Sequence, residues 1–215
     1  MKKKIFSACT KPDVVGYSFG IESGSERMLK HIKKGIKYNQ IEQTIVVCES
    51  VGIVARAAFI VGFPYETQED LKQTVSLALR LRTTQISVNY YSPVPNSEEY
   101  SRLLKDNRIS PPNTLDDFIG KYPFDRINKN FSDIPNKDLN VVYSYLVIRR
   151  FFKNHSTQDK KSWKNITFHY ILKALKEMSV SNLFRSFDMV FRSFFTVIFN
   201  PGIRKKYGLH EKSKP

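Results

Sequence analysis

The sequence has little cysteine. Its 215 residues include two, Cys9 and Cys48, which lie far apart and form no C-x-x-C pair. Their spacing therefore gives no ligand set for zinc or for an iron–sulfur cluster. The four histidines show no ligand spacing either. Low cysteine content is typical of proteins in the reducing cytosol, so the sequence predicts a cytoplasmic protein.

Long apolar runs are also missing. No window approaches the roughly 20 uninterrupted apolar residues of a membrane-spanning helix. The opening MKKKIFSACT lacks the apolar region of a secretory signal, so we expect none here. Hydrophobic residues nevertheless make up 41 % of the chain, which is enough for a packed core and argues against global disorder.

Acidic residues are scarce toward the C-terminus. The formal net charge is +15, and residues 138–215 hold 15 Lys and Arg against 5 Asp and Glu. A region of this kind can face nucleic acid, anionic lipid or an acidic partner protein. A solvated basic surface explains the same composition equally well.

Apolar, β-branched runs alternate with helical patterns between residues 14 and 92. The runs at 14–21, 53–63 and 85–91 are predicted strands, and the segments between them have helical spacing. This order predicts parallel strands joined by right-handed crossovers. The fold class is therefore α/β, either an open doubly wound sheet or part of a (β/α) barrel of the TIM type.

The rest of the chain divides by composition. We expect the α/β unit to occupy residues 1–104 and a loop-rich linker to occupy 105–137. Residues 138–215 are predicted to form a basic, Phe-rich helical region. Two helix starts in the α/β unit show capping-box patterns, Ser23 with Glu26 and Thr67 with Asp70.

Three strand exits carry the residues that could bind a ligand. In parallel β/α folds ligands bind at the carboxyl ends of the strands, and here these ends carry GIESGS (20–25), GFP (62–64) and SPVP (92–95). Glycine at such an end lets a ligand approach the backbone. The carboxylate of Glu22 could accept two hydrogen bonds from a vicinal diol such as ribose. A helix cap, or an ion pair with Lys33 or Lys34, explains Glu22 equally well.

These segments resemble a known family. FGIESGSERMLKHIKKG, FIVGFPYETQEDLKQT and NYYSPVPNSEEY, in this order, are similar to the second half of the catalytic barrel of radical S-adenosylmethionine (SAM) enzymes. The likeness covers about residues 14–100 and is greatest to the class that often carries a cobalamin-binding domain. The segments match the exits of the fourth, fifth and sixth barrel strands. The family usually has G-x-P-G-E-T at the fifth exit and P-x-P-G-T-x-x-Y at the sixth.

The resemblance implies roles for the matching positions. Glu22 would bind the ribose hydroxyls of SAM, and Lys34 would pair with the methionine carboxylate, with Lys33 as the neighbouring alternative. Ile60 would pack on the adenine, although a plain core position explains it as well. The remaining positions would shape the turns or leave room for the ligand, namely Gly20, Ser23, Gly24 and Gly62.

The sequence also departs from the family pattern at positions that the family's chemistry needs. The C-x3-C-x2-C motif that holds the [4Fe–4S] cluster is absent, and neither Cys9 nor Cys48 occupies its place. In the family this cluster chelates SAM and supplies the electron that cleaves the S–C5′ bond. The first three barrel strands and the cobalamin domain are missing too. Tyr65 and Asn96 stand where the family usually has glycine.

We therefore expect the chain to be the C-terminal part of a radical SAM enzyme that is inactive alone. It would be a split-gene half, a truncated reading frame or one piece of a two-piece enzyme, and its partner would be an N-terminal half-barrel. Three strands with helices on one face would leave the other face apolar and one edge unpaired. The isolated chain should then be marginally stable and self-associate.

A binding module is the alternative. Residues 160–206 interleave Phe, Val and Ile with Arg and Lys, as helices at an anionic membrane surface do, or as a segment for a partner protein would. This would place the protein at the membrane periphery. A purely structural explanation of the same residues is a core helix hairpin packed under the barrel. Nucleic acid ranks lower, because these aromatics have helical spacing rather than the arrangement of a stacking platform in a strand.

Overall fold

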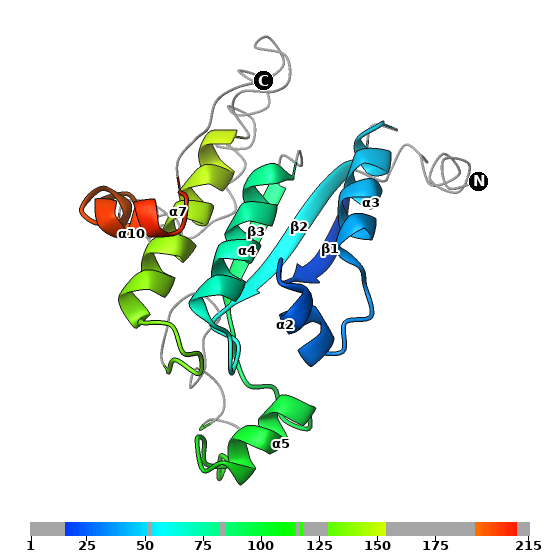
Figure 1. Cartoon of the computed structure of the whole chain (residues 1–215). Coiled ribbons are helices and arrows are strands. Elements are labelled where there is room, and N and C mark those ends of the chain that lie inside the picture. The colour runs from blue at the N-terminus through cyan, green and yellow to red at the C-terminus, as the bar shows by residue number, and fades with distance from the viewer. Residues whose placement is uncertain are drawn as a thin grey trace, which may run out of the picture.

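The computed structural model describes residues 16–50, 53–81, 85–114, 117, 129–153 and 192–209. Three parallel strands form one sheet in the order β1-β2-β3, with β1 at Gly16–Glu22, β2 at Val54–Val61 and β3 at Gln85–Tyr90. The crossovers contain α2 (Glu26–His31) and α3 (Tyr38–Ser50), then α4 (Gln68–Arg80), as Figure 1 shows. The predicted α/β class, with three parallel strands in part of a barrel-like arrangement, is confirmed.

Helices follow the sheet, as the sequence predicts. Helix α5 (Glu98–Lys105) comes directly after the exit of β3, and α7 (Asn136–Lys153) returns to pack on β3. A helical segment at 192–198 leads into α10 (Pro201–Lys206), which contacts α7. Much of the linker 105–137 and residues 154–191 of the Phe-rich region lie outside the described residues. Within the described part, no helix has the length and apolar character needed to cross a membrane.

One face of the sheet forms the core. Alternate strand residues are buried on it together with residues of α3, α4 and α7, and the strand members are Ile21, Ala55, Ala57, Phe59, Val61, Ile86, Val88 and Tyr90. Helix α7 closes this layer beside β3. The ring of Tyr143 stacks on Tyr90 at a centroid distance of 4.3 Å, and the Tyr90 hydroxyl donates to Asn140 Oδ1 at 2.8 Å.

The opposite face is not apolar, so that prediction is wrong. By strand alternation it carries mostly small and polar side chains together with one valine and one isoleucine, namely Gly16, Ser18, Gly20, Val54, Arg56, Ala58, Ile60, Gln85, Ser87 and Asn89. Arg56 Nε donates to Gln85 Oε1 across the strands at 3.0 Å. Alanine, serine and glycine occupy many of the outward positions, so they leave little apolar surface. This removes one of the two reasons for expecting instability; the edge of β1 remains.

The two predicted capping boxes have different outcomes. At α4 the box is present: Thr67 accepts from the Asp70 N–H, and the Asp70 side chain accepts from the Thr67 N–H at 2.9 Å. At α2 the prediction is wrong, because the cap is Ser25, whose hydroxyl accepts from the Met28 N–H at 3.3 Å. The helix therefore begins later than predicted, and Ser23 is left for another role.

Candidate functional site

The end of β1 is irregular at the residue that the sequence singles out. The pairing with β2 shifts register between Gly20 and Glu22, and Glu22 has a left-handed backbone with φ of 68°. A Cβ atom added at Gly20 would lie 2.4 Å from Glu22 Oε1 and 3.1 Å from Lys34 Nζ. Gly20 thus leaves the space that these two side chains occupy, and a larger residue there would displace them.

Glu22 is paired with Lys34 rather than Lys33. Lys34 Nζ donates to Glu22 Oε1 at 2.8 Å, and the two side chains are 32 % and 21 % exposed. Lys33 contacts Glu98 instead, at 2.7 Å, in a pair that is much more exposed. Within the described part of the chain, Glu22 Oε2 accepts no hydrogen bond. One carboxylate oxygen and the other Lys34 N–H groups therefore remain for a ligand.

Ser23 and Gly24 attach this loop to α4. The Ser23 and Thr74 hydroxyls lie 3.1 Å apart, and the Gly24 N–H donates to Thr74 Oγ1 at 3.0 Å. A Cβ at Gly24 would lie 2.6 Å from the Gln73 carbonyl oxygen, so only glycine permits this approach. Both residues are buried. They position the loop that carries Glu22, and their predicted part in cofactor binding stays a prediction.

Asp70 joins the first two strand exits. Its carboxylate accepts from the Ser25 hydroxyl at 2.6 Å, from the Arg27 guanidinium and from the Thr67 N–H at 2.9 Å. Burial would raise the pKa of Asp70, but the hydrogen bonds from Arg27, Ser25 and Thr67 outweigh it and hold the pKa below its usual range. The loop after β1 and the loop after β2 are thus fixed to one charged group.

The β2 exit presents Ile60 and turns at Gly62. Ile60 is partly exposed and pairs with Asn89 of β3 across the sheet. Gly62 has φ of 82°, which favours glycine. A Cβ atom added at Gly62 would point toward α7 and lie 3.5 Å from Leu139 Cδ1. Glycine is needed at Gly62 for the conformation of the turn. Contact of Ile60 or Gly62 with a cofactor stays a prediction.

Sequence reasoning missed two residues near these exits. Glu66 is fully buried and accepts from the Gly62 N–H at 2.6 Å. Burial raises its pKa to about 8, against the lowering effect of the Gly62 and Phe63 N–H groups. Asn89 is exposed on the outer face of the sheet beside Ile60. The signal for Glu66 was its place in GFPYET, directly after the strand.

Two turn residues have a left-handed backbone, the conformation that favours glycine. Tyr65 has φ of 63° and Asn96 has φ of 65°. Both stand where the family that the sequence resembles usually has glycine. Tyr65 is held by its hydroxyl, which donates to Asp106 Oδ2 at 2.8 Å, and by an edge contact with His31.

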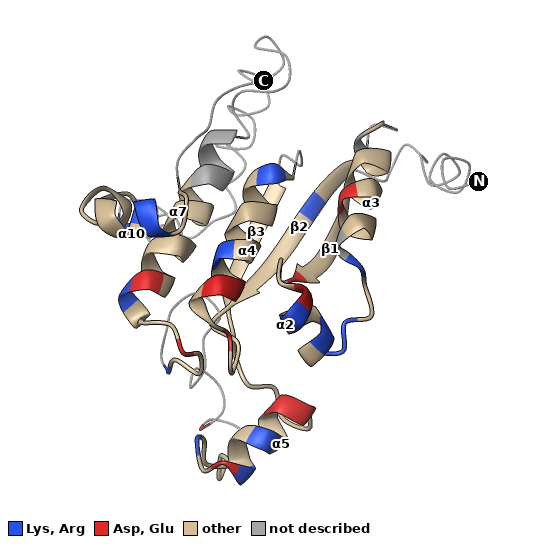
Figure 2. Cartoon of the chain, viewed as in Figure 1, with Lys and Arg blue, Asp and Glu red and all other residues tan. Residues whose placement is uncertain are grey.

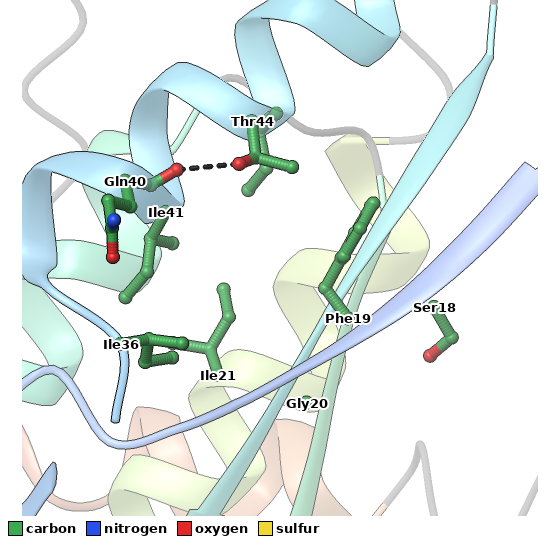
Figure 3. Close-up of a pocket in the computed structure, with 9 residues that line it drawn as sticks. Ser18, Phe19, Gly20, Ile21, Ile36, Gln40, Ile41 and Thr44 are labelled. Carbon is green, nitrogen blue, oxygen red and sulfur yellow. Dashed lines mark hydrogen bonds between the residues drawn. The ribbon is translucent and has the colours of Figure 1, made fainter. Parts of the chain in front are cut away.

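An apolar pocket lies along β1. Its volume is about 270 Å³. Residues of β1, of α3 and of the loop before α3 line it, namely Ser18, Phe19, Gly20, Ile21, Ile36, Gln40, Ile41, Thr44 and Ile45. Figure 3 shows Ile21, Ile36 and Ile41 pointing into the same space. β1 pairs only with β2 in the sheet of described strands. An apolar recess thus lies beside a strand with one unpaired edge.

The described residues contain no group of three or more His, Cys, Asp and Glu side chains that could hold a metal ion. Cys48 is buried as a free thiol in α3, and Cys9 lies outside the described residues. The polar groups at the strand exits fit a ligand with hydroxyl and anionic groups. They do not fit an iron–sulfur cluster, for which cysteine ligands are needed.

The chain is similar to proteins that are named as a methyltransferase, a methylthiotransferase and a cyclase. An uncharacterized methyltransferase of Pyrococcus horikoshii is 32 % identical over 91 residues, which is 42 % of this chain and 20 % of the relative. The ribosomal protein uS12 methylthiotransferase of Caldanaerobacter subterraneus is 31 % identical over 81 residues, 37 % of this chain and 19 % of the relative.

An anaerobic magnesium-protoporphyrin IX monomethyl ester cyclase of Rubrivivax gelatinosus matches more of the chain. It is 25 % identical over 200 residues, 86 % of this chain and 32 % of the relative. No protein-family model matches the chain. The chain thus spans about a fifth to a third of the length of these curated relatives, and its similarity is to part of each.

Proposed function

We propose that this chain supplies the SAM-binding strand exits of a radical SAM barrel whose cluster-bearing half is a separate segment. The observation that carries the proposal is the Glu22–Lys34 pair, held over Gly20 at the carboxyl end of a parallel strand. The three ordered strand-exit motifs support it. The relatives named as methyltransferase, methylthiotransferase and cyclase support it as well.

Each residue has a part that follows from its chemistry. Glu22 Oε2 would accept from the ribose hydroxyls while Lys34 holds Oε1 in place. The other N–H groups of Lys34 would donate to the carboxylate of the amino-acid part, and Ile60 would contact the adenine. When bound, the family's cluster supplies the electron for S–C5′ cleavage. The C-x3-C-x2-C motif is not among these residues, so the part proposed for them is binding.

The pocket beside β1 supports the proposal of a half-barrel partner. A further parallel strand added to the outer edge of β1 would satisfy its unpaired backbone groups, and apolar side chains of its helix would fill the recess. Without that partner we expect the chain to self-associate through this edge. Analytical ultracentrifugation should find oligomers, whereas a stable monomer with a sharp melting transition would contradict this.

The binding claim is tested by calorimetric titration with S-adenosylhomocysteine. Glu22→Gln keeps the shape of the side chain but removes the charge, and we expect its Kd to rise about tenfold, equivalent to roughly 1.4 kcal/mol. Glu98→Gln is the matched control, because Glu98 also pairs with a lysine at this end of the molecule. Equal affinities of the two variants, or no saturable binding by the wild-type chain, would overturn the proposal.

A further inference from the structure

The described C-terminal segment turns its largest apolar side chains outward. Residues 192–198 are helical and Phe199 lies in the turn that follows; Phe194, Phe195, Ile198 and Phe199 are 45 %, 42 %, 44 % and 71 % exposed. We call these four residues the aromatic ridge. They occupy positions i, i+1, i+4 and i+5, which share one face of a helix. The opposite face is turned inward, where Val197 is buried.

The aromatic ridge is a continuous patch rather than a set of scattered residues. The rings of Phe195 and Phe199 stack at a centroid distance of 5.8 Å, and those of Phe194 and Phe195 meet edge to face at 6.2 Å. The other large apolar residues exposed in the described part of the chain are Tyr17 in β1, Val46 in α3 and Val94 in the loop between β3 and α5. Single exposed residues are normal, but a clustered patch marks an interaction surface.

Positive charge accompanies the aromatic ridge. Residues 192–209 contain Arg192, Arg204, Lys205 and Lys206, and no acidic residue. Figure 2 shows blue on α10 and no red on it. Lys206 donates to Asp138 of α7 at 2.6 Å, so part of this charge holds α10 on the folded body. Lys205 is exposed and adds to the positive field of the segment.

The segment is anchored to the core rather than hanging free. Tyr207 and Leu209 are buried in the same cluster as the sheet, and the Tyr207 hydroxyl donates to Asp138 at 2.9 Å. In Figure 1 the helix before α10, in orange, lies at the outer margin of the molecule. The aromatic ridge is thus carried on a folded support, with its face directed away from the core.

We propose that the aromatic ridge and α10 dock the protein on an anionic lipid bilayer. Interfacial helices combine an apolar face with flanking basic residues, as here, and bind through buried apolar area together with attraction to anionic headgroups. The basic residues stand at the two ends of the segment, at 192 and at 204–206, and their charge is complementary to such a surface. This surface consists of other residues than those proposed to bind SAM. Docking would place the protein at a membrane, and it does not depend on SAM binding.

The test is co-sedimentation of the full chain with vesicles. We expect binding to phosphatidylcholine vesicles that contain phosphatidylglycerol, weakening as salt rises, and little binding to phosphatidylcholine alone. Phe199→Ser should reduce binding at least tenfold, and Lys205→Glu should reduce it severalfold. Val94→Ser removes an apolar side chain of 54 % exposure elsewhere and should bind like the wild type. Circular dichroism checks that each variant is folded.

Three outcomes would overturn this proposal. The first is equal binding to neutral and anionic vesicles. The second is binding that Phe199→Ser leaves unchanged in a folded protein. The third is self-association that needs the aromatic ridge, without any vesicle binding, which would identify a second copy as the occupant. The S-adenosylhomocysteine titration measures a different surface, so either proposal can fail without the other.

Discussion

The strand exits and the aromatic ridge depart from the usual inside–outside pattern in opposite directions. At the exits, the polar side chains of Ser23, Ser25, Glu66 and Asp70 are buried. On the aromatic ridge, large apolar side chains are exposed. Burying polar groups is costly unless they are hydrogen-bonded, and most of those at the exits are. The first departure is therefore stabilised by a network. The second exposes clustered apolar side chains, and this is why we propose the ridge as a binding surface.

The largest effect is expected from breaking the network at the strand exits. Asp70→Ala leaves the donors of Ser25, Arg27 and Thr67 without their shared acceptor. Arg27 is 53 % exposed, so the loss comes mainly from the hydrogen bonds to the ionised carboxylate; at about 1.5 to 3 kcal/mol each, we expect a loss of at least about 3 kcal/mol of unfolding free energy. Urea denaturation measures it, with Glu69→Ala as the control, since the Glu69 side chain is 68 % exposed. A loss as small as that of the control would show that the network contributes little.

The buried Glu66 should make stability depend on pH. Burial raises its folded pKa from 4.5 to about 8, so the stabilisation is complete below pH 4.5 and is lost as pH rises through 8. We expect roughly 3 kcal/mol to be lost between pH 5 and pH 8. Thermal melting across this range measures it. Glu66→Gln should remove that slope and Glu69→Gln should keep it; equal slopes in both variants would contradict the assignment.

Backbone strain at the third exit should give a smaller, stabilising change. Asn96 is exposed and has a left-handed backbone, which glycine adopts at no steric cost. Asn96→Gly should therefore raise the unfolding free energy by up to about 1 kcal/mol. Denaturant titration is the measurement, and Asn89→Gly, in a strand, should be destabilising instead. Destabilisation by Asn96→Gly would show that the side chain matters more than the turn.

The aromatic ridge should show the smallest effect on folding. Because the Phe199 side chain is mostly in solvent, Phe199→Ser should change the unfolding free energy by less than about 0.5 kcal/mol. The fully buried Phe59→Ser is the contrast and should cost at least about 3 kcal/mol. A large loss for Phe199→Ser would mean that the ridge stabilises the fold, and would weaken the case for a docking surface.

Much of this architecture could be predicted from the sequence. The three strands were found within a few residues because each is a short β-type run between turn signals. Their parallel order followed from the helices between them. Thr67 and Asp70 gave a capping box that the structure confirms. These are local patterns, and local chemistry decides them.

Long-range contacts could not be predicted in the same way. The sequence allowed Glu22 to pair with Lys33 or Lys34. In the structure Lys33 has a left-handed backbone, with φ of 54°, in the turn after α2, and it pairs with Glu98 while Lys34 pairs with Glu22. Ser23 was expected to cap a helix, but Thr74, which is distant in sequence, binds it. The outer face of the sheet was expected to be apolar, because periodicity shows where apolar residues recur but not how small they are.

The central claim is that Glu22 binds the hydroxyls of a nucleoside. Titration with adenosine and with 2′-deoxyadenosine tests it most directly, because the two ligands differ by one hydroxyl of the diol. A charged hydrogen bond contributes about 1.5 to 3 kcal/mol, so the wild-type chain should bind adenosine at least tenfold more tightly. Glu22→Gln should reduce that preference. Equal affinity of the wild-type chain for both nucleosides would contradict the account.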